Sequence, residues 1–216
     1  MSIQNYQKRF IELAIKQKVL CFGEFTLKSG RASPYFFNAG RFYTGASLSA
    51  LGQSYARTLI DHDLHFDLLF GPAYKGIPLV TIAAASLFEH YKRDYPVCYN
   101  RKEVKDHGEG GLLVGAPLEG RVVIVDDVIT AGTAIREVMQ MIARARAKAA
   151  AVIVGLDRQE RGEGRFSAIQ EIEQAYGIPV ISIINLDNII AYLSANPLLD
   201  FPLEAMLRYR ENYGIQ

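Results

Sequence analysis

Residues 121–134 read RVVIVDDVITAGTA, and this stretch decides the fold class. The branched apolar run at residues 122–125 is typical of a strand that is buried on both faces. Two carboxylates, Asp126 and Asp127, follow the run directly, and a short segment of small and hydroxylated residues then opens a helix. The order of strand, acidic pair, turn and helix predicts one unit of an α/β fold with its functional groups at the carboxyl end of the strand.

Similar apolar runs recur on both sides of this stretch. We predict strands at residues 67–70, 97–99, 122–125, 151–156 and 180–184, and helices between most of them at residues 77–91, 133–146 and 167–176. Strands that alternate with helices imply right-handed crossovers. The sequence therefore predicts an α/β protein with a central, mostly parallel five-stranded sheet flanked by helices.

The two ends of the chain predict smaller elements outside this sheet. At the N-terminal end, a helix is expected over residues 2–19, strands over residues 22–27 and 34–38, and a second helix from Ser47 onward. Two short helices are expected at the C-terminal end, over residues 186–194 and 203–213. A chain of 216 residues is long enough for one domain with a small appendage.

Composition excludes several classes of partner. The formal net charge is +1, so no global field favours nucleic acid or a membrane surface. Cys21 and Cys98 lie far apart in the sequence and suit reduced thiols in a cytosolic protein. The N-terminal segment mixes charges into its apolar residues, unlike a secretory signal. The longest uncharged stretch, residues 76–88, is too short to span a bilayer. We expect a soluble, cytoplasmic protein without a nucleic-acid or membrane partner.

The acidic pair and the turn after it suggest a ligand with two kinds of group. Backbone N–H groups at a helix N-terminus bind phosphate, and Gly132 allows close approach, while Thr130 and Thr133 can add hydroxyl donors. Carboxylates that pointed at the phosphate would repel it. We therefore expect Asp126 and Asp127 to face vicinal hydroxyls, from which they can accept hydrogen bonds. A sugar phosphate carries both groups: hydroxyls for the two carboxylates and a phosphate for the turn.

Two other interpretations fit parts of this pattern. The pair could be a solvated strand end, with Thr133 serving only as a helix cap. A receiver domain of two-component signalling also gathers carboxylates at strand ends, but it places its acidic pair after the first strand. Here the pair follows the third core strand, and a later strand end carries Arg158. The run of strand, acidic pair and glycine turn favours the ribose phosphate site.

A basic, glycine-rich segment follows the second core strand. Residues 100–111 hold Arg101, Lys102, Lys105 and His107 before three glycines. Cations placed in this way can stabilise the charge of an anionic leaving group once water is excluded, and a glycine-rich loop can close and reopen. The alternative is a solvated surface loop with a structural histidine.

Several motifs together resemble a known family. Residues 121–134 resemble the phosphoribosyl diphosphate signature of the type I phosphoribosyltransferases. Four further segments look like bacterial orotate phosphoribosyltransferases: FGEFTLKSGRASPYFFNAG (22–40), LLFGPAYKGIPL (68–79), YNRKEVKDHGEGG (99–111) and LDRQERG (156–162). The resemblance covers nearly the whole chain, and the motifs stand in the family's order.

The resemblance implies both an architecture and an activity. It implies a type I phosphoribosyltransferase fold forming a single domain over residues 1–216, in which residues 1–45 and parts of the C-terminus form a hood over the base. It also implies Mg²⁺-dependent transfer of a phosphoribosyl group from 5-phosphoribosyl 1-diphosphate to orotate, giving orotidine 5′-monophosphate and diphosphate in pyrimidine synthesis. Magnesium is expected to sit mainly on substrate oxygens, with no direct protein ligand assigned.

The family's site residues carry over position by position. The resemblance assigns the phosphoribosyl donor to Tyr74, Lys75, Arg101, Lys102, Lys105, His107, Asp126, Asp127, Val128, Ile129, Thr130, Ala131, Gly132, Thr133 and Ala134. Lys105, His107 and Asp127 are the expected catalytic residues. In the implied homodimer the mobile loop closes across the interface, so that Arg101, Lys105 and His107 serve the partner's site and Lys102 serves its own.

The expected base pocket needs a cation and directed hydrogen bonds for the flat, anionic orotate ring. Lys28 and Arg158 can supply the charge, and Arg158 has the forked geometry that suits a carboxylate or carbonyl. The resemblance assigns orotate contacts to Lys28, Phe36, Phe37, Thr130 and Arg158. Neighbouring residues on a strand face opposite ways, so one of the two phenylalanines is expected in the core. For Arg158 the alternative is an ion pair with Glu160 or Asp157.

The sequence departs from the family pattern at residues 143–148, ARARAK, where such chains commonly carry an Asn-Gly turn. The preceding helix should therefore run longer or end without a glycine cap. The tail after Pro197 is also less typical and receives no assigned function. Two rival functions share the ribose phosphate site. A purine phosphoribosyltransferase would lack the set of Lys28, Phe36, Phe37 and Arg158, and a non-catalytic regulator would carry a basic face for nucleic acid.

Overall fold

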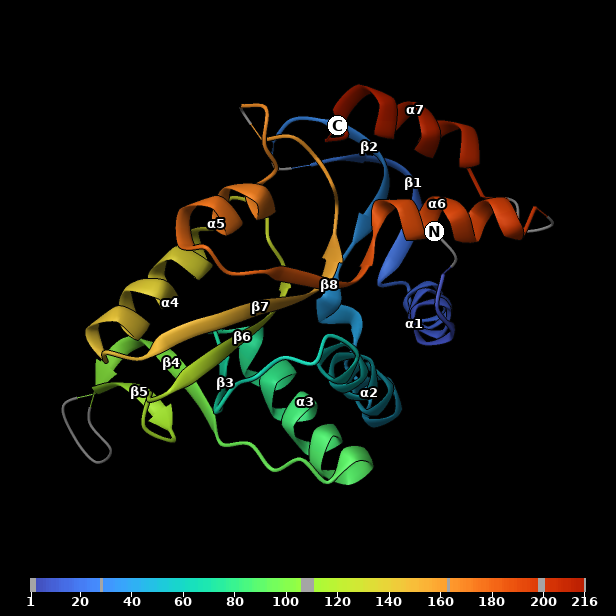
Figure 1. Cartoon of the computed structure of the whole chain (residues 1–216). Coiled ribbons are helices and arrows are strands. Elements are labelled where there is room, and N and C mark those ends of the chain that lie inside the picture. The colour runs from blue at the N-terminus through green and yellow to red at the C-terminus, as the bar shows by residue number, and fades with distance from the viewer. Residues whose placement is uncertain (1–2, 28, 106–110, 163, 198–200, 216) are drawn as a thin grey trace.

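A six-stranded sheet forms the centre of the molecule. The computed structural model describes residues 3–27, 29–105, 111–162, 164–197 and 201–215. The sheet has the order β5-β4-β3-β6-β7-β8 (Figure 1). Its strands are β3 (Leu68–Gly71), β4 (Val97–Lys105), β5 (Gly111–Gly115), β6 (Arg121–Val128), β7 (Lys148–Asp157) and β8 (Val180–Asn185). All neighbouring pairs are parallel except β4 and β5.

Helices cover both faces of this sheet. On one face lie α1 (Asn5–Lys16), α2 (Gly45–Asp61) and α3 (Gly76–Tyr91), and on the other lie α4 (Thr133–Arg144) and α5 (Ala168–Tyr176). Side chains of β6 alternate between the two cores: Val123 and Val125 join the first, whereas Val122 and Ile124 join the second. All four are fully buried, which explains why the strand reads as a continuous apolar run.

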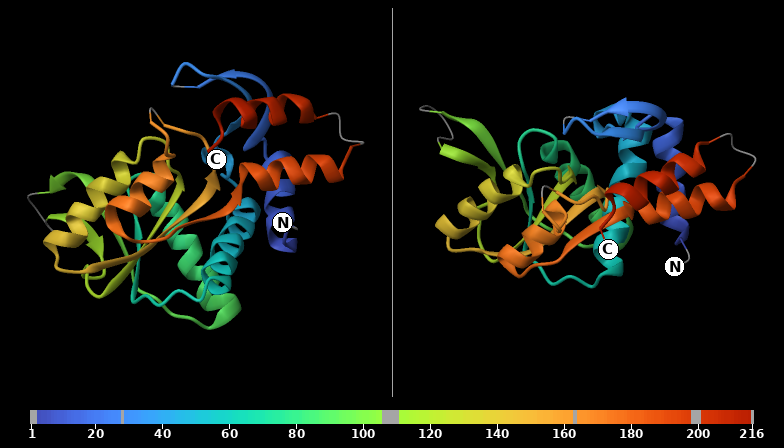
Figure 2. Two further views of the ribbon diagram at one scale, coloured as in Figure 1. Left: turned by 45° about the horizontal axis from the view of Figure 1, so that its top comes forward. Right: turned by 90° about the horizontal axis from the view of Figure 1, so that it is seen from above.

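A small hood stands on one end of the sheet. It consists of the antiparallel hairpin of β1 (Leu20–Thr26) and β2 (Ala32–Phe37), with α6 (Leu186–Ala195) and α7 (Leu203–Tyr213) beside it. A short 3₁₀ turn at Ala39–Arg41 leads from the hairpin into the main domain. Figure 2 shows the hairpin and α7 together above the carboxyl ends of the strands, although they come from opposite ends of the chain. The hood thus overhangs the edge of the sheet where functional loops are expected.

The predicted fold class and most predicted elements are confirmed, with two corrections. The five predicted core strands are the five parallel ones, but the sheet has a sixth strand, β5, which pairs antiparallel with β4. The segment predicted as a basic loop is also largely a strand, since β4 continues to Lys105. Charged residues such as Arg101 and Lys102 suit this position, because a hairpin that extends a sheet at its edge is half solvated.

The end of α4 lacks the glycine that related chains commonly carry there. The helix ends at Arg144, with no glycine cap and without running longer, and Arg146 two residues later adopts φ +58°. This left-handed conformation costs an ordinary residue about 1–2 kcal/mol, whereas glycine adopts it freely. The Arg146 side chain is exposed, so the backbone conformation dominates the energetics of this position.

We therefore expect Arg146→Gly to raise the free energy of unfolding by about 1 kcal/mol, measured by urea denaturation. Gln140→Gly is the matched control, because Gln140 is exposed in the middle of α4 and a glycine there should cost about 1 kcal/mol. A loss of stability in Arg146→Gly would show that the arginine side chain outweighs the backbone strain.

Candidate active site

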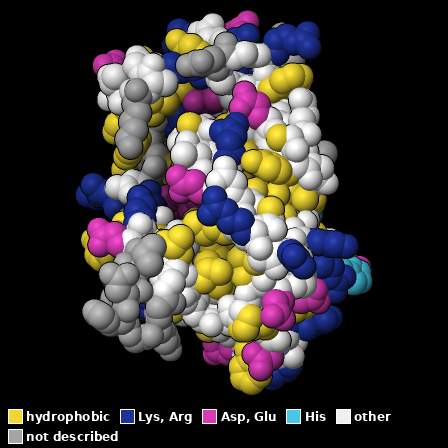
Figure 3. All heavy atoms as spheres, turned by 90° about the vertical axis from the view of Figure 1, so that its left-hand side faces the viewer, with side chains coloured by type: hydrophobic (Ala, Val, Ile, Leu, Met, Phe, Trp, Pro, Cys, Tyr) yellow, Lys and Arg dark blue, Asp and Glu magenta, His cyan; other side chains and the backbone are white. Residues whose placement is uncertain are grey.

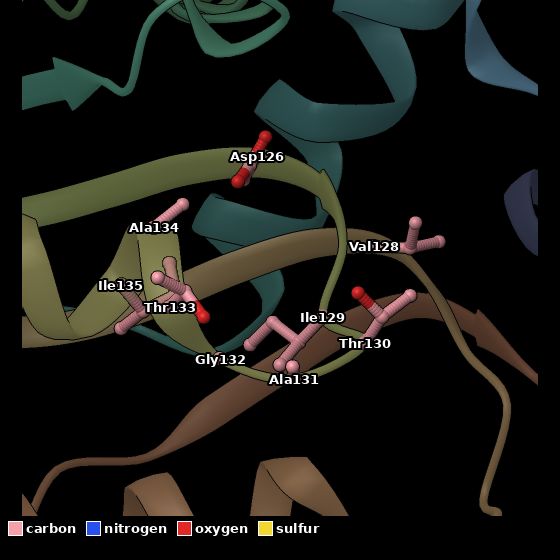
Figure 4. A pocket seen from close by; sticks show the side chains of 9 residues that line it. All are labelled: Asp126, Val128, Ile129, Thr130, Ala131, Gly132, Thr133, Ala134 and Ile135. Atoms are coloured by element: carbon pink, nitrogen blue, oxygen red, sulfur yellow. The ribbon is translucent and has the colours of Figure 1, made fainter. Parts of the chain in front are cut away.

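The loop between β6 and α4 forms an open pocket. The space in it is about 110 Å³, and it is lined by Asp126 and residues 128–135 (Figure 4). Gly132 is the N-cap of α4 with φ +72° and has no side chain to occupy the first amides of the helix. Figure 4 shows Asp126 on the strand side of the space that the loop encloses, with the Thr130 hydroxyl pointing into it from the other side. The first turn of α4 contains no acidic residue. These features fit the predicted anion site.

Gly132 is also held by its surroundings. The Arg136 guanidinium donates to the carbonyl of Ala131 through Nη1 at 2.5 Å and to Glu171 on α5 through Nη2 at 3.1 Å. A Cβ on Gly132 would lie 3.1 Å from that Nη1 atom and 3.3 Å from Ile172. Sequence reasoning missed Arg136, although its place one turn into α4 was visible; its role depends on α5, which the sequence does not place beside it.

The acidic pair is nearly buried at the end of β6. Asp126 and Asp127 are 9% and 6% exposed. The Asp127 N–H donates to Asp126 Oδ1 at 2.9 Å, and the fully buried Tyr55 hydroxyl of α2 donates to the Asp126 carbonyl at 2.8 Å. Burial, and then the neighbouring Asp127 carboxylate, raise the pKa of Asp126 from 3.8 to about 7. Its charge is therefore poised to change near neutral pH.

Lys75 lies against the second carboxylate. Its Nζ atom is 2.6 Å from Asp127 Oδ2, and its own side chain is 57% exposed. Lys75 belongs to the turn after β3, in which the Ala73–Tyr74 peptide bond is cis. The turn is tightly packed: Asn100 Oδ1 accepts the Ala73 N–H at 2.9 Å. The structure thus brings two predicted site segments, the turn after β3 and the acidic pair, into direct contact.

The glycines that bracket this turn are required by packing. A Cβ on Gly71 would overlap the carbonyl group of Gly76, and a Cβ on Gly76 would lie 2.5 Å from Pro72. The turn and the start of α3 therefore approach each other more closely than any other residue type would allow.

The basic segment also reaches the turn. Lys102 on β4 places its Nζ atom 5.3 Å from the centroid of the exposed Tyr74 ring. Arg101 precedes it on the same strand and is half-buried. Three predicted residues lie outside the described part of the molecule: Lys28 and His107 entirely, and the side chain of Lys105. Their assigned roles remain predictions.

The two phenylalanines of β2 divide as strand geometry requires. Phe37 is 8% exposed and packs in the core with its ring centroid 6.5 Å from that of Phe10. Phe36 is 40% exposed and stacks on Phe25 at 5.6 Å. The structure therefore places Phe37 in the core, the alternative considered for one of the pair, while Phe36 faces outward from the hood.

Arg158, at the end of β7, is held by an ion pair in this structure. Its Nη2 atom lies 2.6 Å from Glu160 Oε1, and both side chains are 13% exposed. The guanidinium also lies 4.2 Å above the centroid of the Tyr35 ring. The predicted alternative, an ion pair with Glu160, is thus present. Sequence reasoning missed Tyr35 and Tyr209, which share this cluster, because no local signal shows that α7 returns to the end of β7.

Charges on the surrounding surface are mixed. Figure 3, which views the side that carries α4 and the hairpin of β4 and β5, shows Lys and Arg interspersed with Asp and Glu around an apolar area. Across the described ranges, no helix is long and apolar enough to cross a membrane. Within the same ranges, no group of three or more His, Cys, Asp and Glu side chains gathers into a potential metal centre.

Comparison with known proteins identifies the family. The family profile of the "Phosphoribosyl transferase domain" matches residues 41–174. Orotate phosphoribosyltransferase of Cellvibrio japonicus is 59% identical over 214 residues, covering 99% of this chain and 100% of that protein. The chain belongs to the orotate phosphoribosyltransferase family. The enzyme of the same name from Salmonella typhi is 60% identical over 213 residues, with 99% of this chain and 100% of that protein covered.

Solved orotate phosphoribosyltransferases share the fold. The crystal structure of the Francisella tularensis enzyme superimposes with a TM-score of 0.87 at 45% identity, over 95% of this chain and 99% of that chain. A Mycobacterium tuberculosis orotate phosphoribosyltransferase in complex with 5-phospho-alpha-D-ribosyl 1-diphosphate is 19% identical, with a TM-score of 0.63 over 85% of this chain and 98% of that one. At that identity the match shows the fold alone. The predicted family and type I fold are confirmed.

The raised pKa of Asp126 predicts a pH dependence of donor binding in this member of the family. A carboxyl whose folded pKa lies above its ordinary value binds a proton in the native state between about pH 4 and 7, so its contribution to stability falls as pH rises through that window. Accepting hydrogen bonds from ribose hydroxyls needs the carboxylate instead. The KM for the phosphoribosyl donor should therefore be about tenfold higher at pH 6 than at pH 8.

Steady-state kinetics across this range check the prediction. Asp126→Asn is the control: it should lose the inflection near neutral pH and retain only the titration of the substrate phosphates. An unchanged inflection in Asp126→Asn would assign the pH dependence to another group.

Gly132→Ala should damage the anion site in two ways. The positive φ costs alanine about 1 kcal/mol of stability, and its Cβ displaces Arg136 or Ile172. We expect a rise in the KM for the phosphoribosyl donor larger than that for orotate. Gly177→Ala, also at a positive φ (+65°) but with open space at its Cβ, controls for backbone strain alone. Equal effects of both variants on the two KM values would contradict a role in anion binding.

Proposed function

We propose that this chain transfers the phosphoribosyl group of 5-phosphoribosyl 1-diphosphate to orotate and releases orotidine 5′-monophosphate and diphosphate. The observation that carries the proposal is the pocket at the end of β6, which places a carboxylate and a helix N-terminus on opposite sides of one space. A ribose phosphate needs both groups, since its hydroxyls donate hydrogen bonds and its phosphate accepts them.

Within this pocket the roles divide by charge. Asp126 and Asp127 accept hydrogen bonds from the ribose hydroxyls. Thr130, Thr133 and the amides of the loop around Gly132 bind the 5′-phosphate, and Val128, Ile129, Ala131 and Ala134 shape the loop. Asp127, nearly buried and paired with Lys75, holds the ribose in place while the bond at its anomeric carbon breaks.

Diphosphate is the leaving group and needs cations. In the turn after β3, Lys75 contacts Asp127, and the neighbouring Tyr74 ring is contacted by Lys102. These residues can reach a diphosphate bound beside the acidic pair. The family resemblance adds Arg101, Lys105 and His107, with Lys105 as the principal catalytic residue that stabilises and protonates diphosphate. Partial positive charge develops on the ribose as the bond breaks, so displacement passes through an oxocarbenium-like state flanked by carboxylates and cations.

Orotate would bind between the loop and the hood. Arg158 at the end of β7 offers a forked donor, and Phe36 and Phe37 offer main-chain groups and a ring face from β2. Thr130 connects this pocket to the phosphate site. Lys28 completes the set by resemblance.

Mg²⁺ fits this site only as a partner of the substrate. The described residues offer two neighbouring carboxylates, of which Asp127 is already paired with Lys75, and an octahedral ion needs more oxygens than these. Asp126 and Asp127 would therefore hold it through the ribose and diphosphate oxygens. When bound, the ion neutralises the charge of the leaving diphosphate.

We further propose a homodimer in the cytoplasm. The family resemblance places Arg101, Lys105 and His107 in the partner's site and Lys102 in its own, so each site draws on both copies. The low net charge and the interspersed surface charges support a small-molecule enzyme rather than a nucleic-acid binder.

One assay tests the activity: the loss of orotate absorbance after addition of phosphoribosyl diphosphate and Mg²⁺. Turnover should stop when EDTA chelates the ion and resume when excess Mg²⁺ is restored. The double variant Asp126→Asn/Asp127→Asn should bind the phosphoribosyl donor weakly and lose most activity. Turnover with hypoxanthine or adenine but not orotate would favour a purine phosphoribosyltransferase, and turnover with no base would favour a regulator.

A further inference from the structure

A buried polar cluster surrounds the guanidinium of Arg158. Glu160 Oε1 accepts from Arg158 Nε at 2.7 Å and lies 2.6 Å from Nη2. The Tyr209 hydroxyl of α7 donates to the same oxygen at 2.9 Å and lies 3.4 Å from Arg158 Nη2. Tyr209 therefore touches both partners of the ion pair. Since the residue is only 4% exposed, its hydroxyl position is fixed by packing.

The hood encloses the other side of the same guanidinium. Its Cζ atom lies 4.2 Å from the centroid of the Tyr35 ring, and the buried Ser33 hydroxyl accepts from Nη2 at 3.2 Å. Nη1 donates no hydrogen bond to any residue in the described ranges. The cluster thus engages one edge of Arg158 and leaves the other end of the fork for a ligand.

The loop after Arg158 is also hydrogen-bonded to the C-terminal segment. The Arg161 N–H donates to the carbonyl of Tyr213 at 2.9 Å, and the Ile215 N–H donates to the carbonyl of Gln159 at 2.9 Å. Gln159 itself has φ +50°. The backbone on both sides of Glu160 is therefore fixed by residues about fifty positions later in the chain.

We propose that Tyr209, acting through Glu160, is a positioning residue that sets the orientation of Arg158 for the acceptor base. The α7 helix then belongs to the base pocket rather than to an unassigned tail. This inference rests on the proposed function, because it gives a role to the same pocket. It assigns Tyr209 no contact with substrate.

The physical reason lies in the flexibility of an unsupported arginine. An arginine side chain loses considerable rotamer freedom when it is fixed, and a bidentate contact is productive only if the fork already faces the ligand. Glu160 alone could rotate together with Arg158, as a pair. The Tyr209 hydroxyl at 2.9 Å, together with the more distant Tyr35 hydroxyl at 3.4 Å, opposes this by binding Oε1 from further directions. The Tyr209 ring is itself packed edge-on against Tyr35 at 5.9 Å.

Tyr209→Phe tests the proposal, because it removes the hydroxyl and keeps the ring. We expect the KM for orotate to rise about tenfold, the size of one lost hydrogen bond to a charged group, with the KM for phosphoribosyl diphosphate unchanged. Tyr213→Phe is the matched control. Tyr213 lies one turn later on α7, packs on Tyr209 at 5.1 Å between ring centroids, and contacts the loop through its main-chain oxygen. Its KM values should match those of the wild type.

A double-mutant cycle shows whether the two residues act in series. Glu160→Gln keeps an acceptor oxygen but removes the charge that holds the guanidinium. It should also raise the KM for orotate selectively. If Tyr209 acts through Glu160, the variant Tyr209→Phe/Glu160→Gln should be no worse than the poorer single variant, whereas independent roles would multiply the two effects.

The outcomes separate this inference from the proposed activity. Failure of the wild type to consume orotate would remove the proposed function itself. Normal wild-type turnover with an unchanged orotate KM in Tyr209→Phe would overturn the positioning role alone. An equal rise in both KM values, with a lowered urea midpoint, would also overturn it, because a general loosening of the hood would then be the cause.

Discussion

The structure depends on keeping two adjacent carboxylates nearly buried at the end of a fully buried strand. Like charges at that position repel and lose hydration, so the fold must compensate for them. It does so with a main-chain N–H, with the Lys75 ammonium, and by holding a proton on Asp126 up to neutral pH. The Tyr55 hydroxyl donates to the carbonyl of Asp126 and so fixes the end of the strand. The tight glycine turn after β3 places Lys75 beside Asp127.

Much of the fold could be predicted from sequence because it is governed by local rules. Strands buried on both faces read as apolar runs, and the helices between them show the expected periodicity. The acidic pair and the glycine turn were recognisable because their chemistry is contiguous in the chain. The helix end without a glycine cap was one of the two outcomes predicted from residues 143–148, although the predicted helix ran to residue 146 rather than Arg144. The sixth strand was missed because the chain continues from β4 through the charged residues 101–105, which resemble a loop, before β5 pairs back with Cys98, Tyr99, Asn100 and Lys105.

The rest of the site could not be predicted because it depends on which distant segments meet. The contact of Lys75 with Asp127 joins residues 52 positions apart, and that of Tyr209 with Glu160 joins residues 49 apart. Neither pair has a local signature. Sequence reasoning therefore identified Arg158 and left the tail that supports it without a role. The separation of Phe36 from Phe37 by burial, in contrast, was predicted, because neighbouring residues on a strand face opposite ways.

The ion pair between Lys75 and Asp127 has a consequence for how a substrate binds. A ribose hydroxyl that takes Asp127 Oδ2 as its acceptor replaces the ammonium group, which then needs a new anion. The arriving substrate carries that anion in its own phosphates. Binding is therefore an exchange of partners in which neither charge is left alone, and a sugar without phosphates would have to leave the lysine uncompensated. The ion pair thereby favours a phosphorylated sugar over plain ribose.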